Sequence, residues 1–373
     1  MSKYEVKLNS ILPPESKSDY LPDYLFEEEC VKVSRIYYLY YSFILNVFKI
    51  ILKLRLKILG SSYKKYENDP LHKDVENIYS REAENYEYKH HLTTNFRDTW
   101  WRRQIGLEVI NYIYTNKKNK EKVKLLDLGT GTGLSLEEMF KIFKLFNIKI
   151  NAVGLDYNQK MLEQAEKIVL PRMTKSGLLE ERVRELRFTR GDARNLTEDT
   201  KGKEKELEYF QRDLFDCITI LFGIGGVDAQ LEAIREQLVV LKPNGILAIT
   251  DIHRPIIKLK EKWPWFIGKK NADAFAIMAW ERITKPLVLS TLWGWRDPTF
   301  IFYIDRFVVD YDKDKNIYYG FESISLFLDN EFWWYGLPVM PTAKAVFKKV
   351  KINEAEFNKR MEIFNKLSPY YKK

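Results

Sequence analysis

Short apolar runs alternate with longer helical patterns through the middle of the chain. Apolar runs bounded by turn residues are typical of buried strands, and apolar residues at every third or fourth position are typical of helices. The predicted strands are Val123–Leu128, Ile148–Leu155, Leu186–Thr189, the first part of 213–227, and Ile246–Thr250. The predicted helices between them are Leu136–Phe146, Gln159–Glu185 and Asp228–Leu241. This alternation predicts an α/β fold, a doubly wound and mostly parallel sheet, with a ligand site at the carboxyl ends of its strands.

The pattern changes after residue 255, where aromatic residues become frequent. Phe300–Val309 and Ile317–Leu328 predict a hairpin, and Ala343–Ile352 predicts a last antiparallel strand. Seven of the nine tryptophans lie in this part of the chain, at positions 263, 265, 280, 293, 295, 333 and 334. Such aromatic residues either form a core or line an apolar substrate pocket.

Ahead of the alternating region, residues 35–59 are apolar but are interrupted at regular intervals by polar side chains. Only Ile36–Phe48 is free of charge, whereas a membrane span needs about 20 apolar residues. On a helix the polar residues would form one cationic stripe. These residues are Arg35, Ser42, Asn46, Lys49, Lys53 and Lys57. Residues 1–30 are polar, and we expect them to be weakly structured.

Charge sets this N-terminal segment apart from the rest of the chain. The net charge is +9, and residues 31–65 contain eight Lys or Arg and no Asp or Glu. A helix that combines lysines with a broad apolar face is typical of the interface of an anionic bilayer, so we expect residues 31–65 to contact a membrane surface. Two alternatives remain open: the helix packs on the protein's own core, or it spans the membrane. The nearly neutral remainder does not predict a nucleic-acid partner.

Length and cysteine content add little to this picture. A chain of 373 residues can form one large core with an appendage. Cys30 and Cys217 provide neither a disulfide framework nor metal-ligand spacing. The first residues lack the pattern of a signal peptide. We therefore expect a cytoplasmic protein that is peripheral to the membrane.

The segment 127–133, Asp-Leu-Gly-Thr-Gly-Thr-Gly, joins the first predicted strand of the sheet to its helix. Glycines allow a tight turn and the close approach of a ligand, and the helix behind them offers free N–H groups. A dinucleotide fingerprint would need glycine at position 134, which is occupied by Leu134. A P-loop would need Gly-Lys-Ser/Thr, which the turn lacks. Neither motif is therefore present. At the next strand end, Asp156 can accept hydrogen bonds from both hydroxyls of a ribose.

This glycine turn resembles motif I of class I S-adenosylmethionine (SAM) methyltransferases, whose fold is Rossmann-like. The resemblance implies that Asp127 helps to place the methionine ammonium group, that Asp156 binds the ribose, and that Asp192 binds the adenine amino group. It implies further cofactor contacts from Gly129, Thr130, Gly131, Gly133, Tyr157, Met161, Ala193 and Gly223. Met161 is equally suited to a core, and Asp192 to a solvated loop.

Two other stretches resemble the ubiquinone/menaquinone C-methyltransferase family. One is 213–227, which matches that family's pattern at Phe215, Asp216, Ile218, Thr219, Phe222, Gly223 and Val227. The other is 77–87 with Trp100 or Trp101, which partly matches its N-terminal signature and implies that Tyr79 and Tyr86 close over the cofactor. The alternative for both tyrosines is ordinary helix packing. Gly225-Gly226 replaces the family's Arg-Asn where substrate is expected.

Methyl transfer from a sulfonium depends mainly on alignment of the nucleophile, the methyl carbon and the sulfur. If a base is used, His253 is the first candidate, because it follows the fifth strand at the ligand edge, and Asp251 is the second. The alternative for His253 is an ordinary polar turn. The other histidines show no metal-ligand spacing, so no metal is expected.

These patterns predict four parts: residues 1–70, an extension with the membrane-interface helix 35–59; 71–118, a helical lead that closes over the cofactor; 119–255, the SAM-binding core; and 256–373, a substrate-side region that completes the sheet.

We expect a SAM-dependent methyltransferase that acts on an apolar or amphipathic, membrane-associated small molecule. C-methylation of a quinone-like ring is the first choice and N-methylation of a lipid headgroup or another amine is the alternative. An inactive, membrane-docked SAM-binding protein is a third hypothesis. The oligomeric state is not predicted.

Overall fold

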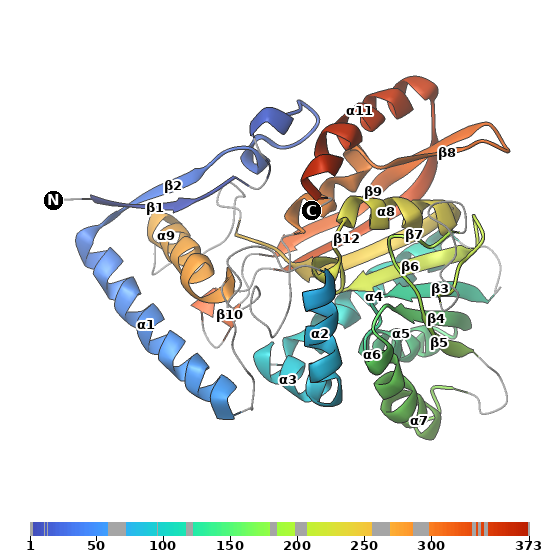
Figure 1. Cartoon of the computed structure of the whole chain (residues 1–373), viewed down its shortest axis with the longest axis horizontal. Coiled ribbons are helices and arrows are strands. Elements are labelled where there is room, and N and C mark those ends of the chain that lie inside the picture. Colours follow the sequence, from blue (N-terminus) through green and yellow to red (C-terminus); the bar gives the residue numbers. More distant parts are fainter. Residues whose placement is uncertain are drawn as a thin grey trace.

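An eight-stranded sheet forms the centre of the protein (Figure 1). The computed structural model describes residues 3–10, 12, 14–58, 72–94, 96–116, 122–179, 185–197, 207–255, 269–285, 298–329, 333–334, 337–338 and 342–371. The strand order is β5-β4-β3-β6-β7-β12-β9-β8. Its parallel strands are β3 (Val123–Leu128), β4 (Ile150–Asp156), β5 (Leu186–Arg190), β6 (Phe215–Leu221) and β7 (Leu241–Ile252). The antiparallel strands are β8 (Val309–Asp312), β9 (Ile317–Asp329) and β12 (Thr342–Ile352). This topology confirms the predicted α/β class.

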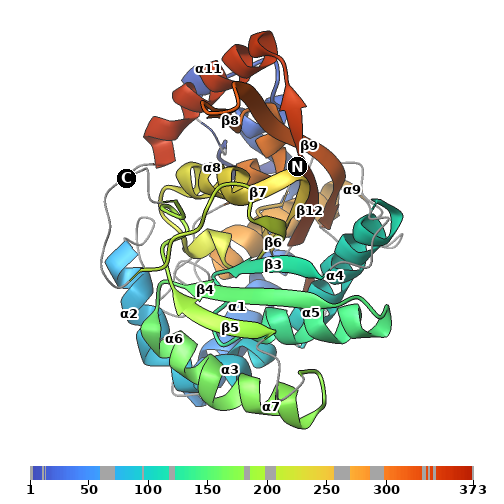
Figure 2. The ribbon, with the colours of Figure 1, turned by 90° about the vertical axis from the view of Figure 1, so that its right-hand side faces the viewer.

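Around β3, β4, β6 and β7 both faces of the sheet are buried, and consecutive strand residues point into different cores. Leu125 belongs to a core shared with α4 (Arg97–Asn116) and α5 (Leu134–Leu145). Leu126 belongs to a second core. That core is shared with α8 (Gln230–Val240), α11 (Glu354–Tyr371) and the 3₁₀ helix η7 (Thr299–Arg306). Figure 2 shows α8 and α11 on one side of the sheet and α5 on the other.

The described residues between 3 and 34 include two paired strands and two 3₁₀ turns, so the prediction that 1–30 are weakly structured is wrong for them. β1 (Lys3–Leu8) pairs antiparallel with β2 (Glu29–Ser34), and the chain between them forms the 3₁₀ turns η1 (Pro14–Ser16) and η2 (Asp23–Leu25). The hairpin leads directly into α1 (Arg35–Ile58). Strand and helix pack on α9 (Lys269–Ala279), which continues as a π-helical turn, η6 (Trp280–Thr284). Because the partner lies more than 200 residues away, the local pattern could not reveal this packing.

Short helices connect this N-terminal unit with the sheet. α2 (His72–Glu82), the 3₁₀ turn η3 (Ala83–Asn85) and α3 (Tyr86–Thr93) precede α4. The connection that follows β4 comprises α6 (Gln159–Gln164), the π-helical turn η4 (Ala165–Val169) and α7 (Leu170–Lys175). The helix predicted to reach Glu185 therefore ends at Lys175, where Gly177 adopts φ +69° and terminates it. The predicted linker Gly60–Pro70 lies outside the described residues.

The aromatic C-terminal region differs from its prediction at one strand. Thr299–Arg306 is the 3₁₀ helix η7 rather than a strand, and pairing begins only at Val309. Phe300 to Ile304 is a continuous buried run, and such a run does not distinguish strand from helix. β10 (Trp333–Trp334) and β11 (Leu337–Pro338) form a separate small ladder. The tryptophans at 263, 265, 293 and 295 lie outside the described residues, and Trp280 is buried beside α1 and α9.

Candidate active site

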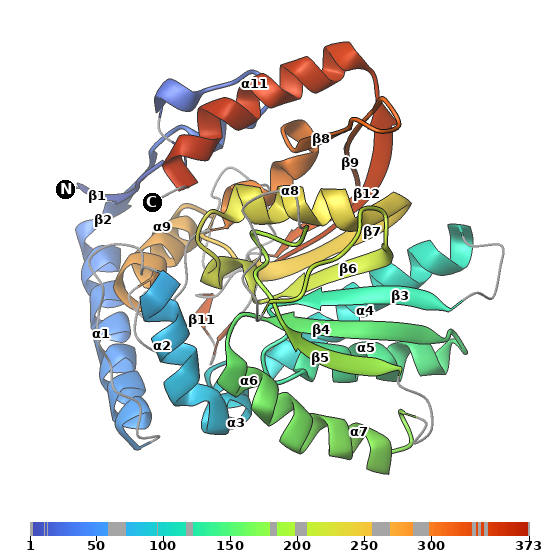
Figure 3. The same cartoon turned by 45° about the vertical axis from the view of Figure 1, so that its right-hand side comes forward.

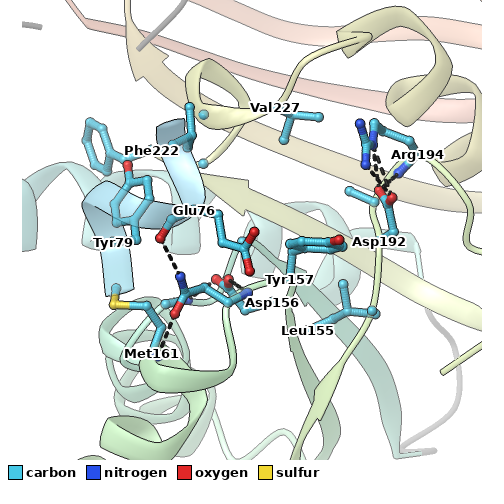
Figure 4. Close-up of a pocket in the computed structure, with 18 of the residues that line it drawn as sticks. Glu76, Tyr79, Leu155, Asp156, Tyr157, Met161, Asp192, Arg194, Phe222 and Val227 are labelled. Atoms are coloured by element: carbon cyan, nitrogen blue, oxygen red, sulfur yellow. Dashed lines mark hydrogen bonds and ion pairs between the residues drawn. The ribbon is translucent and has the colours of Figure 1, made fainter. Parts of the chain in front are cut away.

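A pocket lies at the carboxyl ends of β3, β4 and β6, where the fold predicts a ligand (Figure 4). The core contributes the glycine turn and the residues that follow each strand, and α2 and α3 contribute the opposite wall. Ten residues predicted to bind cofactor line it: Tyr79, Tyr86, Gly129, Gly131, Asp156, Tyr157, Met161, Asp192, Ala193 and Gly223. Asp127, Thr130 and Gly133 lie behind the lining, in or next to the turn.

The glycine turn has the conformation that its sequence implies. Gly129, Gly131 and Gly133 adopt φ values of +59°, +57° and +89°, a region that favours glycine. A Cβ atom on Gly129 would lie 3.3 Å from the Cα of Gly223, which follows β6. The turn and the β6 exit therefore approach each other more closely than side chains would allow.

Asp127 is buried at the end of β3 with one carboxylate oxygen available. Thr219 Oγ1 donates to Asp127 Oδ1 over 2.6 Å, and Asp127 Oδ2 has no hydrogen-bond partner among the described residues. Burial raises the pKa of Asp127 to about 6, and the hydroxyls of Thr219 and Thr130 and the charge of Arg102 oppose that shift. A buried carboxylate with an unpaired oxygen fits a cationic group of a ligand, as the ammonium group of SAM would require.

Backbone N–H groups from two segments, the glycine turn and the start of α6, orient the carboxylate of Asp156. Its Oδ2 accepts from the N–H of Gly131 over 2.8 Å, and its Oδ1 accepts from the N–H of Asn158 over 2.8 Å. Each oxygen has a second lone pair, which leaves capacity for two ribose hydroxyls. Burial raises the pKa of Asp156, and the three backbone N–H groups from residues 131, 157 and 158 counteract the rise.

The helices α2 and α3 cover the pocket, and each has a polar contact with the helices that follow β4: Asn158 contacts α2, and Arg172 of α7 pairs with Glu87 of α3 over 3.0 Å. Asn158 Nδ2 donates to the carbonyl of Glu76 (2.9 Å) and to Ser80 Oγ (2.7 Å). The rings of Tyr79 and Tyr86 lie 5.9 Å apart. Burial raises the pKa of Tyr86 to about 12 and that of Tyr79 well above 10, so both hydroxyls stay protonated near neutral pH.

Asp192 has a partner that the sequence did not suggest. Arg194 binds it through two nitrogens, Nε to Oδ1 at 2.8 Å and Nη2 to Oδ2 at 2.6 Å, and binds Asp228 through Nη1 at 2.5 Å. Figure 4 shows this fork at the edge of the pocket, and Arg194 is itself a lining residue. Any contact of Asp192 with an adenine must therefore use its remaining lone pairs.

Phe222 is a second residue that the sequence did not identify as part of the site. It follows β6, lines the pocket and adopts φ +61°, which is unusual for an aromatic residue. The guanidinium of Arg102 lies 5.2 Å from its ring centroid, and the Trp101 ring centroid lies 5.5 Å from it. Its position in the family pattern was the available signal, whereas its backbone conformation was not readable.

The two predicted base candidates do not line the pocket. His253 is fully buried, its Nδ1–H donates to the carbonyl of Arg254 over 2.5 Å, and its ring packs edge-on against Phe302. Burial lowers the pKa of His253 to about 4, so the ring is neutral. Asp251 accepts from the N–H of Gly225 over 3.0 Å and supports the turn η5 (Ile224–Gly226) beside the pocket. The assignment of either residue as a base therefore stays a prediction.

A buried polar cluster lies directly behind Phe222. Asp98 accepts from Arg102 Nη1 (2.6 Å), His91 Nδ1 (3.0 Å) and Thr94 Oγ1 (2.8 Å). The ring of His90 stacks on Tyr86 with centroids 5.3 Å apart. Among the described residues, no group of three or more His, Cys, Asp or Glu is arranged to hold a metal ion.

The family model and the curated relatives that match this chain name the same kind of protein, a methyltransferase. Residues 66–267 match the ubiE/COQ5 methyltransferase family. A demethylmenaquinone methyltransferase of Thermotoga maritima is 31% identical over 181 residues, which cover 48% of this chain and 62% of that protein. Another from Lactobacillus johnsonii is 28% identical over 190 residues, 50% of this chain and 65% of that protein. This chain thus aligns with less than two thirds of either relative. The similarity to solved structures is lower. The structure of a Haemonchus contortus phosphoethanolamine N-methyltransferase aligns with a TM-score of 0.45 and 10% sequence identity, and the alignment covers 82% of this chain and 56% of that protein.

Proposed function

Because this chain belongs to the ubiE/COQ5 methyltransferase family, we propose that it transfers a methyl group from SAM to a quinone-like ring carbon of a membrane-resident molecule. Family membership confirms the resemblance read from the glycine turn, and SAM is the corresponding cofactor. When bound, SAM supplies an electrophilic methyl group on a sulfonium. The acceptor and its membrane location are the proposed part.

The observation that carries the proposal is the set of carboxylates at successive strand ends around one pocket. Asp127 has a free oxygen for the methionine ammonium, and Asp156 presents lone pairs for the ribose. Met161 and Tyr157 line the same pocket as Asp192, where an adenine would lie. The residues present therefore fit SAM, and the protein's role is to orient it.

The opposite part of the lining suits an apolar acceptor. Phe222, Val227, Val75 and the two tyrosines of the covering helices form this wall, and Gly226 leaves space beside Tyr79. A planar ring could pack against these aromatic side chains. The buried tyrosine hydroxyls stay protonated and could donate hydrogen bonds to a ring oxygen, whereas His253 is not among the residues that line the pocket.

Transfer of a labelled methyl group tests the proposal. The purified protein is incubated with methyl-labelled SAM and a total lipid and quinone extract, and the labelled product is identified by mass spectrometry. We expect label on a ring carbon of a quinone. SAM binding without any transfer would overturn the proposal and support an inactive SAM-binding protein.

Calorimetry with the Asp156→Ala variant tests the cofactor site separately. We expect SAM affinity to fall by at least ten-fold, because the variant loses the ribose acceptors and the support of the Gly131 N–H. Asp314→Ala removes an exposed carboxylate away from the pocket and is the matched control. Unchanged affinity in the Asp156 variant would contradict this assignment.

One observation favours N-methylation as the second candidate. The lining includes Glu76, whose carboxylate could hold an ammonium group of an amine acceptor, and Gly225-Gly226 replaces the Arg-Asn pair of the resembled pattern. Label on a nitrogen in the same transfer experiment would select this candidate over ring methylation.

A further inference from the structure

The helix α1 contacts the protein along one face only. Tyr41 and Leu45 are buried, and Tyr38, Phe48 and Leu52 pack against the same core. The Tyr41 ring meets Phe275 of α9 edge-on, with centroids 5.0 Å apart. Arg282 binds α1 through Tyr38 Oη (2.9 Å) and Ser42 Oγ (2.8 Å). α1 is therefore held in place by packing and by hydrogen bonds.

The face of α1 that points away from the protein is also apolar. Ile36 is 70% exposed, Phe43 69% and Ile50 60%. On a helix these positions lie roughly opposite Tyr41 and Leu45. Nine exposed large hydrophobic residues lie on α1: Ile36, Tyr37, Leu39, Tyr40, Phe43, Val47, Ile50, Ile51 and Leu54. Elsewhere in the described part of the chain such residues are scattered or in small groups, so this face is a contiguous patch of the kind that marks an interaction site.

A row of lysines borders this patch. Lys49, Lys53 and Lys57 follow one another at intervals of four and are exposed. Helical geometry places them between the buried face and the exposed apolar face, on the same side as Arg35 and Asn46. Residues 31–65 contain no Asp or Glu. A partner for this surface must therefore be apolar at its centre and negatively charged along one edge.

We propose that α1 lies on an anionic membrane surface, with its outer face among the lipid chains and its lysine row at the headgroups. A bilayer interface provides the required chemistry, since acyl chains and anionic headgroups lie at adjacent depths. The helix is long and apolar enough to span a membrane, which alone is weak evidence. Spanning would separate α1 from α9 and break the bonds to Arg282, whereas lying on the surface retains them.

The position of α1 relative to the pocket connects the proposed membrane surface with the proposed reaction. The core beneath α1 includes Trp101 and Ile252, and Phe222 packs against it. Ile252 ends β7 and Phe222 follows β6, so both lie at the carboxyl edge of the sheet where the pocket is. Figures 1 and 3 show α1 outermost, with α9 between it and the remainder of the fold. A membrane under α1 would thus lie on the pocket side of the sheet, a relation that rests on the proposed function.

Co-sedimentation of the full-length protein with vesicles tests the surface. Vesicles of phosphatidylcholine alone are compared with vesicles that contain 30% phosphatidylserine, at about 0.1 M and 0.5 M salt. We expect binding to the anionic vesicles that weakens at high salt. The variant Lys49→Glu/Lys53→Glu/Lys57→Glu should reduce the bound fraction at least ten-fold, and Phe43→Ser/Ile50→Ser should do so without a change in charge.

Matched controls separate this surface from general effects. Lys160→Glu/Lys167→Glu/Lys175→Glu changes the net charge equally on exposed residues of α6, η4 and α7. Tyr114→Ser/Leu145→Ser removes two exposed apolar side chains on α4 and α5. Both controls should bind like the unmodified protein.

Three results would overturn the proposal. One is vesicle binding that the α1 variants leave unchanged, and another is an equal loss in the controls. The third is a dimer in light scattering that Phe43→Ser/Ile50→Ser abolishes while vesicle binding is absent, because then a second copy covers the face. Transfer to a detergent-solubilised acceptor distinguishes the two proposals: if transfer persists without vesicle binding, only the membrane surface fails, and if vesicles bind without transfer, only the proposed reaction fails.

Discussion

At the scale of single residues, burial raises the pKa of the pocket carboxylates Asp127 and Asp156. Their charge therefore depends on pH and on neighbouring groups. Asp127 and Asp156 are both oriented by hydrogen bonds, but only Asp127 has an oxygen without a partner among the described residues. An ionised carboxylate in that position is costly until a cation binds it. Stability and ligand affinity should therefore respond to pH in opposite ways.

The first prediction concerns the pH dependence that Asp127 imposes. Its pKa is about 6 in the folded protein and about 3.9 in an unfolded chain, so the folded state binds more protons between these values. The contribution of Asp127 to stability should fall by about 2 kcal/mol as pH rises from 4 to 7. Urea unfolding of the protein and of Asp127→Asn across this range measures it, and equal slopes for both proteins would contradict it.

SAM affinity should show the reverse trend. Binding of an ammonium group requires the ionised carboxylate, so affinity should decrease about ten-fold between pH 7.5 and 5. Calorimetry in two buffers of different ionisation enthalpy should detect proton release on binding at pH 5.5. Asp127→Asn should bind weakly and lose this component, and any remaining pH dependence would report Asp156.

A further residue-scale prediction concerns Asp98. Burial alone would raise its pKa, but the hydrogen bond from His91 and the charges of His90 and Arg102 lower it overall. A depressed pKa stabilises the fold above about pH 4, and that stabilisation is lost as pH falls further. Asp98→Ala leaves Arg102 buried without its carboxylate and should reduce unfolding free energy by about 3–5 kcal/mol.

Urea denaturation at pH 7 checks the Asp98 value. Glu362→Ala breaks the exposed pair with Lys366 and is the control, which should not change stability measurably. A small effect of Asp98→Ala would show that water or His90, which lies 3.5 Å from Arg102 Nη2, compensates Arg102. Because Arg102 lies over Phe222, the Asp98 variant should also weaken SAM binding.

At the scale of elements, separate side chains hold the two covering helices, because Arg172 pairs with Glu87 of α3 and Asn158 contacts α2. Asn158 Nδ2 donates to Glu76 and Ser80 of α2, while its Oδ1 accepts from the N–H of Met161 and caps α6. One side chain therefore performs two separable functions. Loss of the two bonds to α2 should therefore favour local opening of the cover.

Asn158→Asp separates these functions, because aspartate keeps the cap acceptor but lacks the two donors. We expect hydrogen exchange in residues 72–93 to accelerate several-fold, while α6 and the control helix α8 are unchanged. Asn158→Ala should accelerate exchange in α6 as well and cost about 1 kcal/mol of stability. Exchange at the unmodified rate in residues 72–93 of Asn158→Asp would show that other contacts hold the cover closed.

At the scale of the whole molecule, the N-terminal hairpin and α1 are part of the folded body. They cover α9, whose residues Ala274, Phe275 and Ile277 are buried in the shared core. Those α9 residues would be exposed if the N-terminal segment were absent. An extension that merely tethers the enzyme would not create such a core.

Deletion of residues 1–58 should therefore damage more than membrane contact. We expect the truncated protein to bind a hydrophobic dye strongly and to aggregate in size-exclusion chromatography, because α9 loses its cover. Full-length Phe43→Ser/Ile50→Ser is the control, and it should stay soluble and unfold at an unchanged urea concentration. A monomeric, dye-negative truncation would show that α1 is detachable.

Much of the core fold and of the pocket could be predicted from sequence, because the relevant signals are local. Each buried parallel strand is a short apolar run, and the residue after it must lie at the ligand edge. The glycine turn, Asp156 and Asp192 follow from this rule, and the residues around them line one pocket. The charge of α1 is likewise a property of one continuous segment.

Tertiary packing decided everything that depends on a partner far along the chain. His253 occupies a predicted ligand edge, yet Phe302 and its own turn bury it. The hairpin β1–β2 and the inner face of α1 exist because α9 packs beside them. Sequence periodicity indicates that a residue is buried but not against what, since contacts over 200 residues depend on the packing of the whole chain. For this reason the sequence determined the chemistry of the glycine turn and of α1, and only the structure decided which groups face the pocket and which face of α1 remains free.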